Sequence, residues 1–170
     1  MRNTLKLTLL AAALVCGLSS YAQKLGYINR SELIMMMPER DSAEKKLQVY
    51  SNDLSTQLDA IQVEFNTKFQ EYQKNSTTLS ESVRQLKEKE LQELQGRYQE
   101  FAQVAQQDLQ KMEEQLMEPI VKRADEATAK VSKANGLLIV FDQASGAMAY
   151  FDEVNLTDVL PLVKTELGIK

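Results

Sequence analysis

The chain has 170 residues, of which 44% are apolar and 26% are charged, and it contains no histidine, no tryptophan and one cysteine. Without histidine, a Ser-His-Asp or Cys-His nucleophile pair and a His-ligated metal site are excluded. The single cysteine, Cys16, falls in a segment that we expect to be removed, so the mature chain should contain no disulfide and no Cys-ligated metal. Any catalysis would therefore rest on carboxylates, Lys, Tyr or hydroxyl groups, and no catalytic residue is apparent among them. We expect a protein that is not an enzyme and that holds no metal and no cofactor.

The first 22 residues have the pattern of a secretory signal peptide. Arg2 and Lys6 form a positively charged region before an apolar stretch at residues 7–18, and Ser20 and Ala22 supply the small residues that precede a cleavage site. The apolar stretch is shorter than the ~20 residues that span a bilayer. We predict cleavage after Ala22 and export of residues 23–170 as one domain.

The predicted mature chain is acidic. Loss of Arg2 and Lys6 takes the basic count from 20 to 18 against 24 acidic residues, which is a net charge of −6. Nucleic-acid binding by counterion release needs a basic stripe, so nucleic acid is excluded as a partner. The same charge balance argues against contact with an anionic membrane surface.

The mature chain begins with the pattern of a short strand. Residues 24–29 read KLGYIN, and residues 33–37 then predict a brief helical turn that Pro38 ends. Residues 39–135 contain one Gly and one Pro and are rich in Gln, Glu, Lys and Leu, a composition typical of long helices.

Two apolar stripes predict two long amphipathic helices. Steps of three and four residues connect Leu47 with Tyr72, and a second series of such steps connects Leu94 with Ala134. Between them, residues 75–82 are rich in Asn, Ser and Thr, which cap helices and form them poorly. This pattern predicts an antiparallel helical hairpin, an arm of about residues 41–118 with its tip at about 75–82.

The last part of the chain has the pattern of a small β structure. Asn135-Gly136 predicts a helix stop, and residues 137–141 form an apolar run typical of a buried strand. A hairpin loop at residues 143–147 should lead to a second strand at 148–151, and residues 155–158 should cap a final amphipathic helix. Residues 24–40 and 119–170 thus form the predicted body. Three short strands leave open edges, which favours association of several copies.

The residues resemble the Skp family of OmpH-like chaperones. The resemblance rests on the strand KLGYIN, the long charged hairpin, EPI at 118–120, NGLLIVFD at 135–142, YFD at 150–152 and LTDVL at 156–160. It implies an α+β, mainly α fold: a homotrimer in which a long antiparallel helical hairpin projects from a small β body shared between subunits. It further implies a periplasmic, ATP-independent holdase that binds unfolded outer-membrane β-barrel proteins in a cavity between the helical arms. The best-studied members are strongly basic, and that charge is linked with binding of lipopolysaccharide and phospholipid. This chain departs from them in its acidic charge, which argues against contact with a membrane or with lipopolysaccharide.

Candidate client contacts are apolar residues of the hairpin, and candidate subunit contacts are apolar residues of the sheet. A hairpin residue on a stripe can pack the two helices against each other instead of binding a client, whereas a residue off the stripes is not needed for that packing. A residue of the sheet can likewise pack in the core of its own chain instead of contacting another subunit. The hairpin set is Val63, Phe65, Phe69, Tyr72, Leu91, Tyr98, Phe101 and Val104, and the sheet set is Ile28, Leu138, Val140, Met148 and Tyr150.

A competing hypothesis is an envelope scaffold whose hairpin docks one defined partner helix. A scaffold should keep its apolar residues in the helix seam and present a rigid tip. The polar tip and the off-stripe apolar residues favour the holdase.

Overall fold

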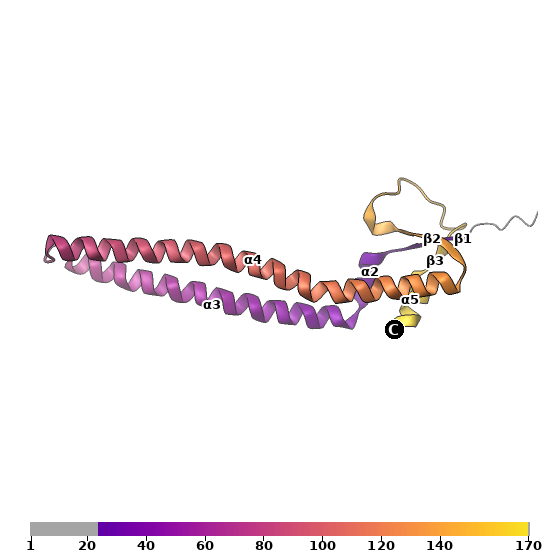
Figure 1. Ribbon diagram of the computed structural model, residues 1–170, viewed down its shortest axis with the longest axis horizontal. Helices are drawn as coiled ribbons and strands as arrows, with labels where there is room; N and C mark the ends of the chain where they lie inside the picture. Colours follow the sequence, from indigo (N-terminus) through magenta and orange to yellow (C-terminus); the bar gives the residue numbers. More distant parts are fainter. Residues whose placement is uncertain (1–23, 170) are drawn as a thin grey trace, which may run out of the picture. The chain divides into compact units, whose positions relative to one another are not determined.

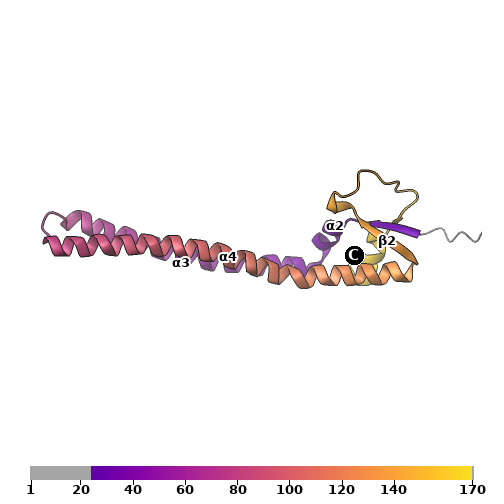
Figure 2. The same cartoon turned by 45° about the horizontal axis from the view of Figure 1, so that its top comes forward.

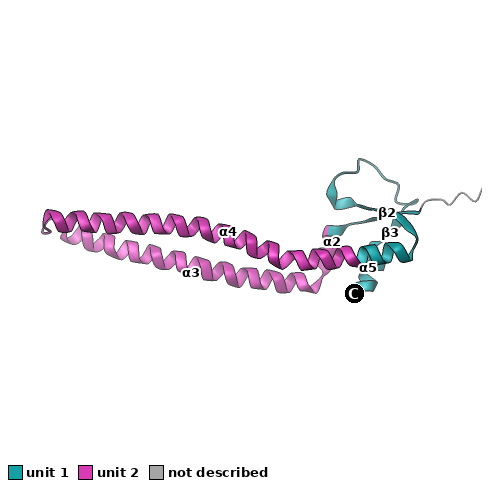
Figure 3. Ribbon diagram, viewed as in Figure 1, with its two compact units in different colours: residues 1–30, 127–168, 170 teal, residues 31–126, 169 magenta. Residues whose placement is uncertain are grey.

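The computed structural model of the protein describes residues 24–169, so the predicted signal peptide and its cleavage site lie outside the described residues. The elements follow in the order β1 (Lys24–Ile28), α2 (Arg30–Met36), α3 (Pro38–Asn75), α4 (Glu81–Ala134), β2 (Leu137–Asp142), the 3-10 turn η1 (Gln143–Ser145), β3 (Thr157–Asp158) and α5 (Leu160–Leu167) (Figure 1). Contacts within the chain divide it into two compact units (Figure 3). Unit 1 holds residues 24–30 and 127–168, and unit 2 holds residues 31–126. No helix among residues 24–169 is both long and apolar enough to cross a bilayer.

Unit 2 is dominated by an antiparallel pair of long helices, which lie side by side in both views (Figures 1 and 2). Its helix α3 has 38 residues, about 57 Å at 1.5 Å per residue. At the tip, the backbone N–H and the hydroxyl of Thr78 both donate to the carbonyl of Asn75, over 2.9 and 2.8 Å. The Ser80 carbonyl accepts from Arg84 N at 2.9 Å, inside the first turn of α4. The predicted helical hairpin is thus confirmed, and its turn lies between Asn75 and Glu81.

The seam of the hairpin follows the two predicted stripes. Leu54 on α3 and Leu94, Ala105 and Ile120 on α4 are buried, each with 7% or less of its surface exposed. Most other stripe residues are half-buried, because two helices alone cover only one side of each other. At the end remote from the tip, Glu39 and Arg123 form an ion pair between the helices.

Unit 1 contains a parallel three-stranded sheet in the order β2-β1-β3. In it, Tyr27 of the central strand lies opposite Phe141 of β2 and Asp158 of β3. The carbonyl of Tyr27 also accepts from Val159 N at 2.9 Å. The number of strands matches the prediction, but the third strand is Thr157–Asp158 instead of residues 148–151.

The predicted second strand at residues 148–151 is wrong. After β2, the Asp142 carboxylate accepts from Ala144 N at 2.9 Å and starts η1, and Gly146 adopts a left-handed φ of 65°. The chain then leaves the sheet and returns to the free edge of β1 only at Thr157–Asp158. Since β1 pairs parallel with both neighbours, no tight hairpin can connect these strands.

The last helix is shorter than predicted. It begins at Leu160, because Thr157 and Asp158 belong to a strand, and the Asp158 carboxylate accepts from Leu160 N at 3.0 Å. The core of unit 1 consists of apolar residues with 7% or less of their surface exposed. They are Ile28 of β1, Ala127 and Val131 of α4, Val159, and Val163 of α5.

The strand β2 is less buried than its sequence indicates. Leu138 is 61% exposed and Ile139 is 46% exposed in the single chain, although the apolar run predicts a buried strand. The physical reason is its place at the edge of the sheet, where only β1 pairs with it. No strand among residues 24–169 pairs with its other edge.

Candidate functional site

The hairpin exposes apolar side chains that its seam does not use. Val63 is 63% exposed and Val104 is 45% exposed, so both lie on the surface as their off-stripe positions predict. Leu91 is only half-buried. Two further residues, Val49 at 60% and Leu86 at 58%, escaped the sequence reasoning. Both residues lie off the two apolar stripes, and the sequence could have identified them by that position.

These exposed residues do not form one patch. Val63 lies two positions before the stripe residue Phe65, about 200° away around α3, and so on the outer face of that helix. Leu86 and Val104 are 18 residues apart, about five turns of 3.6 residues, and therefore share a face of α4. The exposed apolar residues are thus spread over different faces of the hairpin.

The aromatic residues near the tip are held by local contacts. Phe65 and Phe69 stack with ring centroids 5.9 Å apart, and Phe69 remains 40% exposed. The hydroxyl of Tyr72 donates to the Glu88 carboxylate across the helices at 2.5 Å. This hydrogen bond raises the pKa of Tyr72 above 10.0, because it holds the phenol proton. Phe101 is half-buried.

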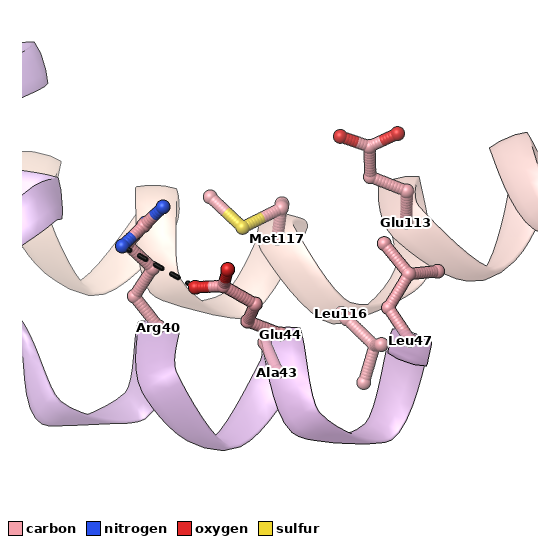
Figure 4. A pocket seen from close by; sticks show the side chains of 7 residues that line it. All are labelled: Arg40, Ala43, Glu44, Leu47, Glu113, Leu116 and Met117. Carbon is pink, nitrogen blue, oxygen red and sulfur yellow. Dashed lines mark ion pairs between the residues drawn. The ribbon is translucent and has the colours of Figure 1, made fainter. Parts of the chain in front are cut away.

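One groove lies on the hairpin near Ala43, with a volume of about 300 Å³ (Figure 4). Apolar side chains of both helices line it, with charged residues at its rim. Arg40 and Glu44 form an ion pair at 3.5 Å, whereas Glu113 has no ion-pair partner among the described residues. The figure shows Glu113 at the other end of the groove from that pair. The lining residues are Arg40, Ala43, Glu44, Leu47, Glu113, Leu116 and Met117.

A second groove, of about 340 Å³, lies closer to the tip. It brings together two residues of the predicted client set, Phe65 and Tyr98, over Leu94, which is buried. Ile61 completes its apolar lining, and the amides of Gln62, Gln95 and Gln99 complete its rim. This groove combines aromatic surface with hydrogen-bonding groups that carry no charge.

A further groove of the hairpin, of about 310 Å³, is lined mainly by charged side chains. Arg97 pairs with Glu64 at 2.6 Å, and Lys68 of α3 reaches Glu90 of α4 at 3.6 Å. Lys87 also donates to Glu90, at 3.2 Å. This hydrogen bond and the charge of Lys68 lower the pKa of the Glu90 carboxyl. No group of three or more metal-ligating side chains occurs among residues 24–169.

Comparison with known proteins places the chain in a family. The family model for outer membrane proteins of the OmpH-like type matches residues 24–167. The chain belongs to the OmpH-like family. The chaperone protein Skp of Vibrio cholerae is 26% identical over 150 residues, which cover 85% of this chain and 89% of that protein. The chaperone protein Skp of Yersinia enterocolitica is also 26% identical, over 96% of this chain and 100% of that protein.

The fold agrees with a solved structure of the OmpH-like family. The crystal structure of an OmpH-like outer membrane chaperone from Caulobacter crescentus matches with a TM-score of 0.73. The match covers 88% of this chain and 86% of that chain, at 11% sequence identity, so it concerns the fold alone.

The residues predicted for a shared sheet divide into two groups in this OmpH-like chain. Ile28 lies in β1, and Leu138 and Val140 lie in β2. Met148 and Tyr150 lie in the loop before β3, so their assignment to the sheet is wrong. Tyr150 is 85% exposed there. A two-residue strand such as β3 has no pattern of its own by which the sequence could have revealed it.

Proposed function

We propose that this protein is a periplasmic holdase chaperone that binds unfolded outer-membrane β-barrel proteins and prevents their aggregation. Family membership and the curated relatives named chaperone protein Skp support this proposal. Export by the predicted signal peptide accounts for the compartment. A chaperone outside the cytoplasm has no ATP to hydrolyse, so its affinity comes from contact with apolar surface and from hydrogen bonds.

The observation that carries the proposal is the exposed apolar surface of the hairpin. Val49, Val63 and Leu86 each expose more than half of their surface on helices whose seam is already formed. Unfolded β-barrel proteins expose apolar residues in alternation. Many weak contacts spread over several faces hold such a chain without one fixed geometry. A scaffold that docks one defined helix would instead gather its apolar residues on one face.

We propose further that the protein works as a homotrimer and that its clients lie between the hairpins. The edge strand β2, with Leu138 and Ile139 exposed, supports association through unit 1. Pairing of this edge with another copy would satisfy its backbone groups and cover both side chains. The acidic charge of the chain, −4 over all residues, favours protein clients over an anionic lipid surface.

Native mass spectrometry tests both parts of the proposal together. The purified protein is mixed with a urea-unfolded outer-membrane β-barrel protein and diluted into buffer. We expect a dominant species of three copies with one client, and clear solutions by light scattering. A trimer that leaves the client to aggregate would refute the holdase and favour the scaffold. A monomer that keeps the client soluble would refute only the trimer.

A further inference from the structure

Three consecutive methionines lie in different surroundings. Met35 is 64% exposed and Met36 is 40% exposed, whereas Met37 is 1% exposed. Methionine is among the residue types that are most often fully buried, so two neighbouring exposed methionines are uncommon. The proposed function uses neither of them, because its apolar contacts lie on α3 and α4.

The helix period explains the difference in exposure. Met35 and Met36 are the last two residues of α2. The N–H of Met37 donates to the Ile34 carbonyl at 3.2 Å, so the helical turn continues to Met37. Successive side chains of a helix point about 100° apart. Met37 therefore lies on the same face as Leu33, which is 0% exposed, and Met35 lies on the opposite face.

Methionine is the most readily oxidised side chain of the predicted mature chain. That chain contains no Cys, no His and no Trp. A small oxidant must touch the thioether sulfur to convert it to a sulfoxide. Three further methionines, Met112, Met117 and Met148, are half-buried. In the part of the chain that the structure describes, Met35 and Met36 are therefore the methionines that an oxidant in solution reaches most readily.

A peroxide supplies the oxygen atom for this reaction and accepts the electrons. A lone pair of the methionine sulfur attacks one oxygen of hydrogen peroxide, the O–O bond breaks and a sulfur–oxygen bond forms. The other oxygen leaves as hydroxide and takes the proton of the transferred hydroxyl group, which gives water. The sulfur is oxidised by two electrons and the peroxide is reduced by the same two, so each methionine gains one oxygen atom.

The position of each methionine decides what its sulfoxide does to the fold. A sulfoxide is polar. On Met35 and Met36 it faces water, and a change at an exposed position has little effect on stability. On Met37 the same oxygen would be buried and would lose its hydrogen bonds to water, which is costly.

We propose that Met35 and Met36 form a reversible oxidation site for peroxides, at which the protein takes up two oxygen atoms and keeps its fold while Met37 stays reduced. The oxidised protein has a polar surface on α2 where the reduced protein has an apolar one. Methionine sulfoxide reductases return the sulfoxide to the thioether, and the exposure that permits oxidation also gives these enzymes access. The site does not depend on the proposed chaperone function.

Peptide mass spectrometry tests the selectivity. Trypsin cuts after Arg30 and Arg40, so one peptide holds the exposed pair together with Met37 as its internal control. The folded protein is treated with dilute hydrogen peroxide, the reaction is stopped with free methionine, and the chain is digested. We expect fragment ions to place one oxygen on Met35 and one on Met36. Met37 should react at least about tenfold more slowly, because it is reached only when the structure opens locally.

A parallel reaction in urea is the control for intrinsic reactivity, and all three methionines should react there at similar rates. Methionine sulfoxide reductases, added to the oxidised folded protein, should return the peptide to its original mass.

Paired variants test the effect on the fold without any oxidant. Met35→Gln with Met36→Gln places polar groups at both exposed positions, and we expect its melting temperature to lie within about 2 °C of the wild type. Met37→Gln is the matched variant at the buried position. It should lower the melting temperature by at least about 5 °C or prevent folding, because its amide is buried.

Three results would overturn the proposed site. One is oxidation of Met37 in the folded protein as fast as that of Met35 and Met36, and another is no oxygen uptake at the exposed pair. The third is a loss of stability in the paired variant as large as that caused by Met37→Gln. A peptide that keeps its added oxygen in the presence of the reductases would overturn the reversibility of the site.

Discussion

A Cβ atom on Gly26 would lie 2.8 Å from the Cγ2 methyl of Val159, closer than such atoms approach in proteins. The same Cβ would be 3.0 Å from the carbonyl oxygen of Thr157 and 3.1 Å from the Cδ1 of Leu137. Gly26 therefore lets both neighbouring strands and the start of α5 pack closely on the centre of the sheet. Val159 is fully buried at this point, so it has no room to move away.

We expect Gly26→Ala to lower the free energy of unfolding by about 2 kcal/mol, the usual cost of overpacking a core. The matched control is Gly96→Ala, because Gly96 lies inside α4 and a Cβ atom added there would meet no neighbouring atom within 4 Å. That change should raise the free energy of unfolding by about 0.5–1 kcal/mol through helix propensity. Urea denaturation measures both. Equal effects would show that the sheet tolerates the methyl group.

The Asp142 carboxylate connects the end of β2 with the start of α2. Its Oδ1 accepts from Arg30 N at 3.2 Å and from Ala144 N at 2.9 Å. We expect Asp142→Ala to cost about 1–2 kcal/mol, as the loss of a helix cap does. Hydrogen exchange should accelerate at both amides. Asp142→Asn keeps an acceptor oxygen and should therefore lower the free energy of unfolding much less than Asp142→Ala. If both variants lower it equally, the negative charge of Asp142 matters and its hydrogen bonds do not.

Glu90 should make the stability of the hairpin depend on pH. Its folded-state pKa is lowered below 4.5 by the hydrogen bond from Lys87 and by the charge of Lys68. A lowered folded-state pKa stabilises the protein above the unfolded-state pKa, and this contribution disappears as pH falls through the folded-state pKa. We expect Glu90→Gln to lower the melting temperature near neutral pH and to match the wild type in acid. A difference that persists at low pH, or that resists high salt, would contradict this mechanism.

Association through β2 can be tested with a charge on its exposed face. Leu138→Asp would place a carboxylate where the proposed trimer buries an apolar side chain. Burial of an unpaired carboxylate costs more free energy than the contact supplies. We expect dissociation of the oligomer in size-exclusion chromatography with light scattering. Tyr150→Asp, in the loop outside the strands, is the control and should leave the oligomer intact. Dissociation by both variants would extend the interface to the loop.

The exposed valines of the hairpin should affect client binding without affecting stability. Val63→Ser and Val104→Ser remove apolar surface from solvent-facing positions, so each should change the free energy of unfolding by less than about 0.5 kcal/mol. We expect the double variant to need more protein to keep an unfolded outer-membrane protein soluble in a light-scattering assay. Leu91→Ser, at a half-buried position, should lower the melting temperature as well. Unchanged activity of the double variant would remove both valines from the proposed surface.

The seam of the hairpin could be predicted from the sequence, but the pairing of side chains between its two helices could not. Leu54, Leu94 and Ile120 follow from steps of three and four residues, which reflect the helix period alone. The alignment of one helix against the other then decides that Phe65 meets Tyr98 and that Glu64 meets Arg97. One stripe by itself does not determine that alignment, because several registers bury equally apolar residues.

The amino-acid sequence by itself determined the helical hairpin and the strands β1 and β2, because each depends on the period, capping and turn chemistry of neighbouring residues. Only the tertiary structure decided that β1 pairs parallel with β2 and β3 and that residues 148–151 form no strand. It also decided which side chains of α3 and α4 meet at each groove of the hairpin. These features join residues far apart in the chain, and their free energy comes from packing that no local pattern records.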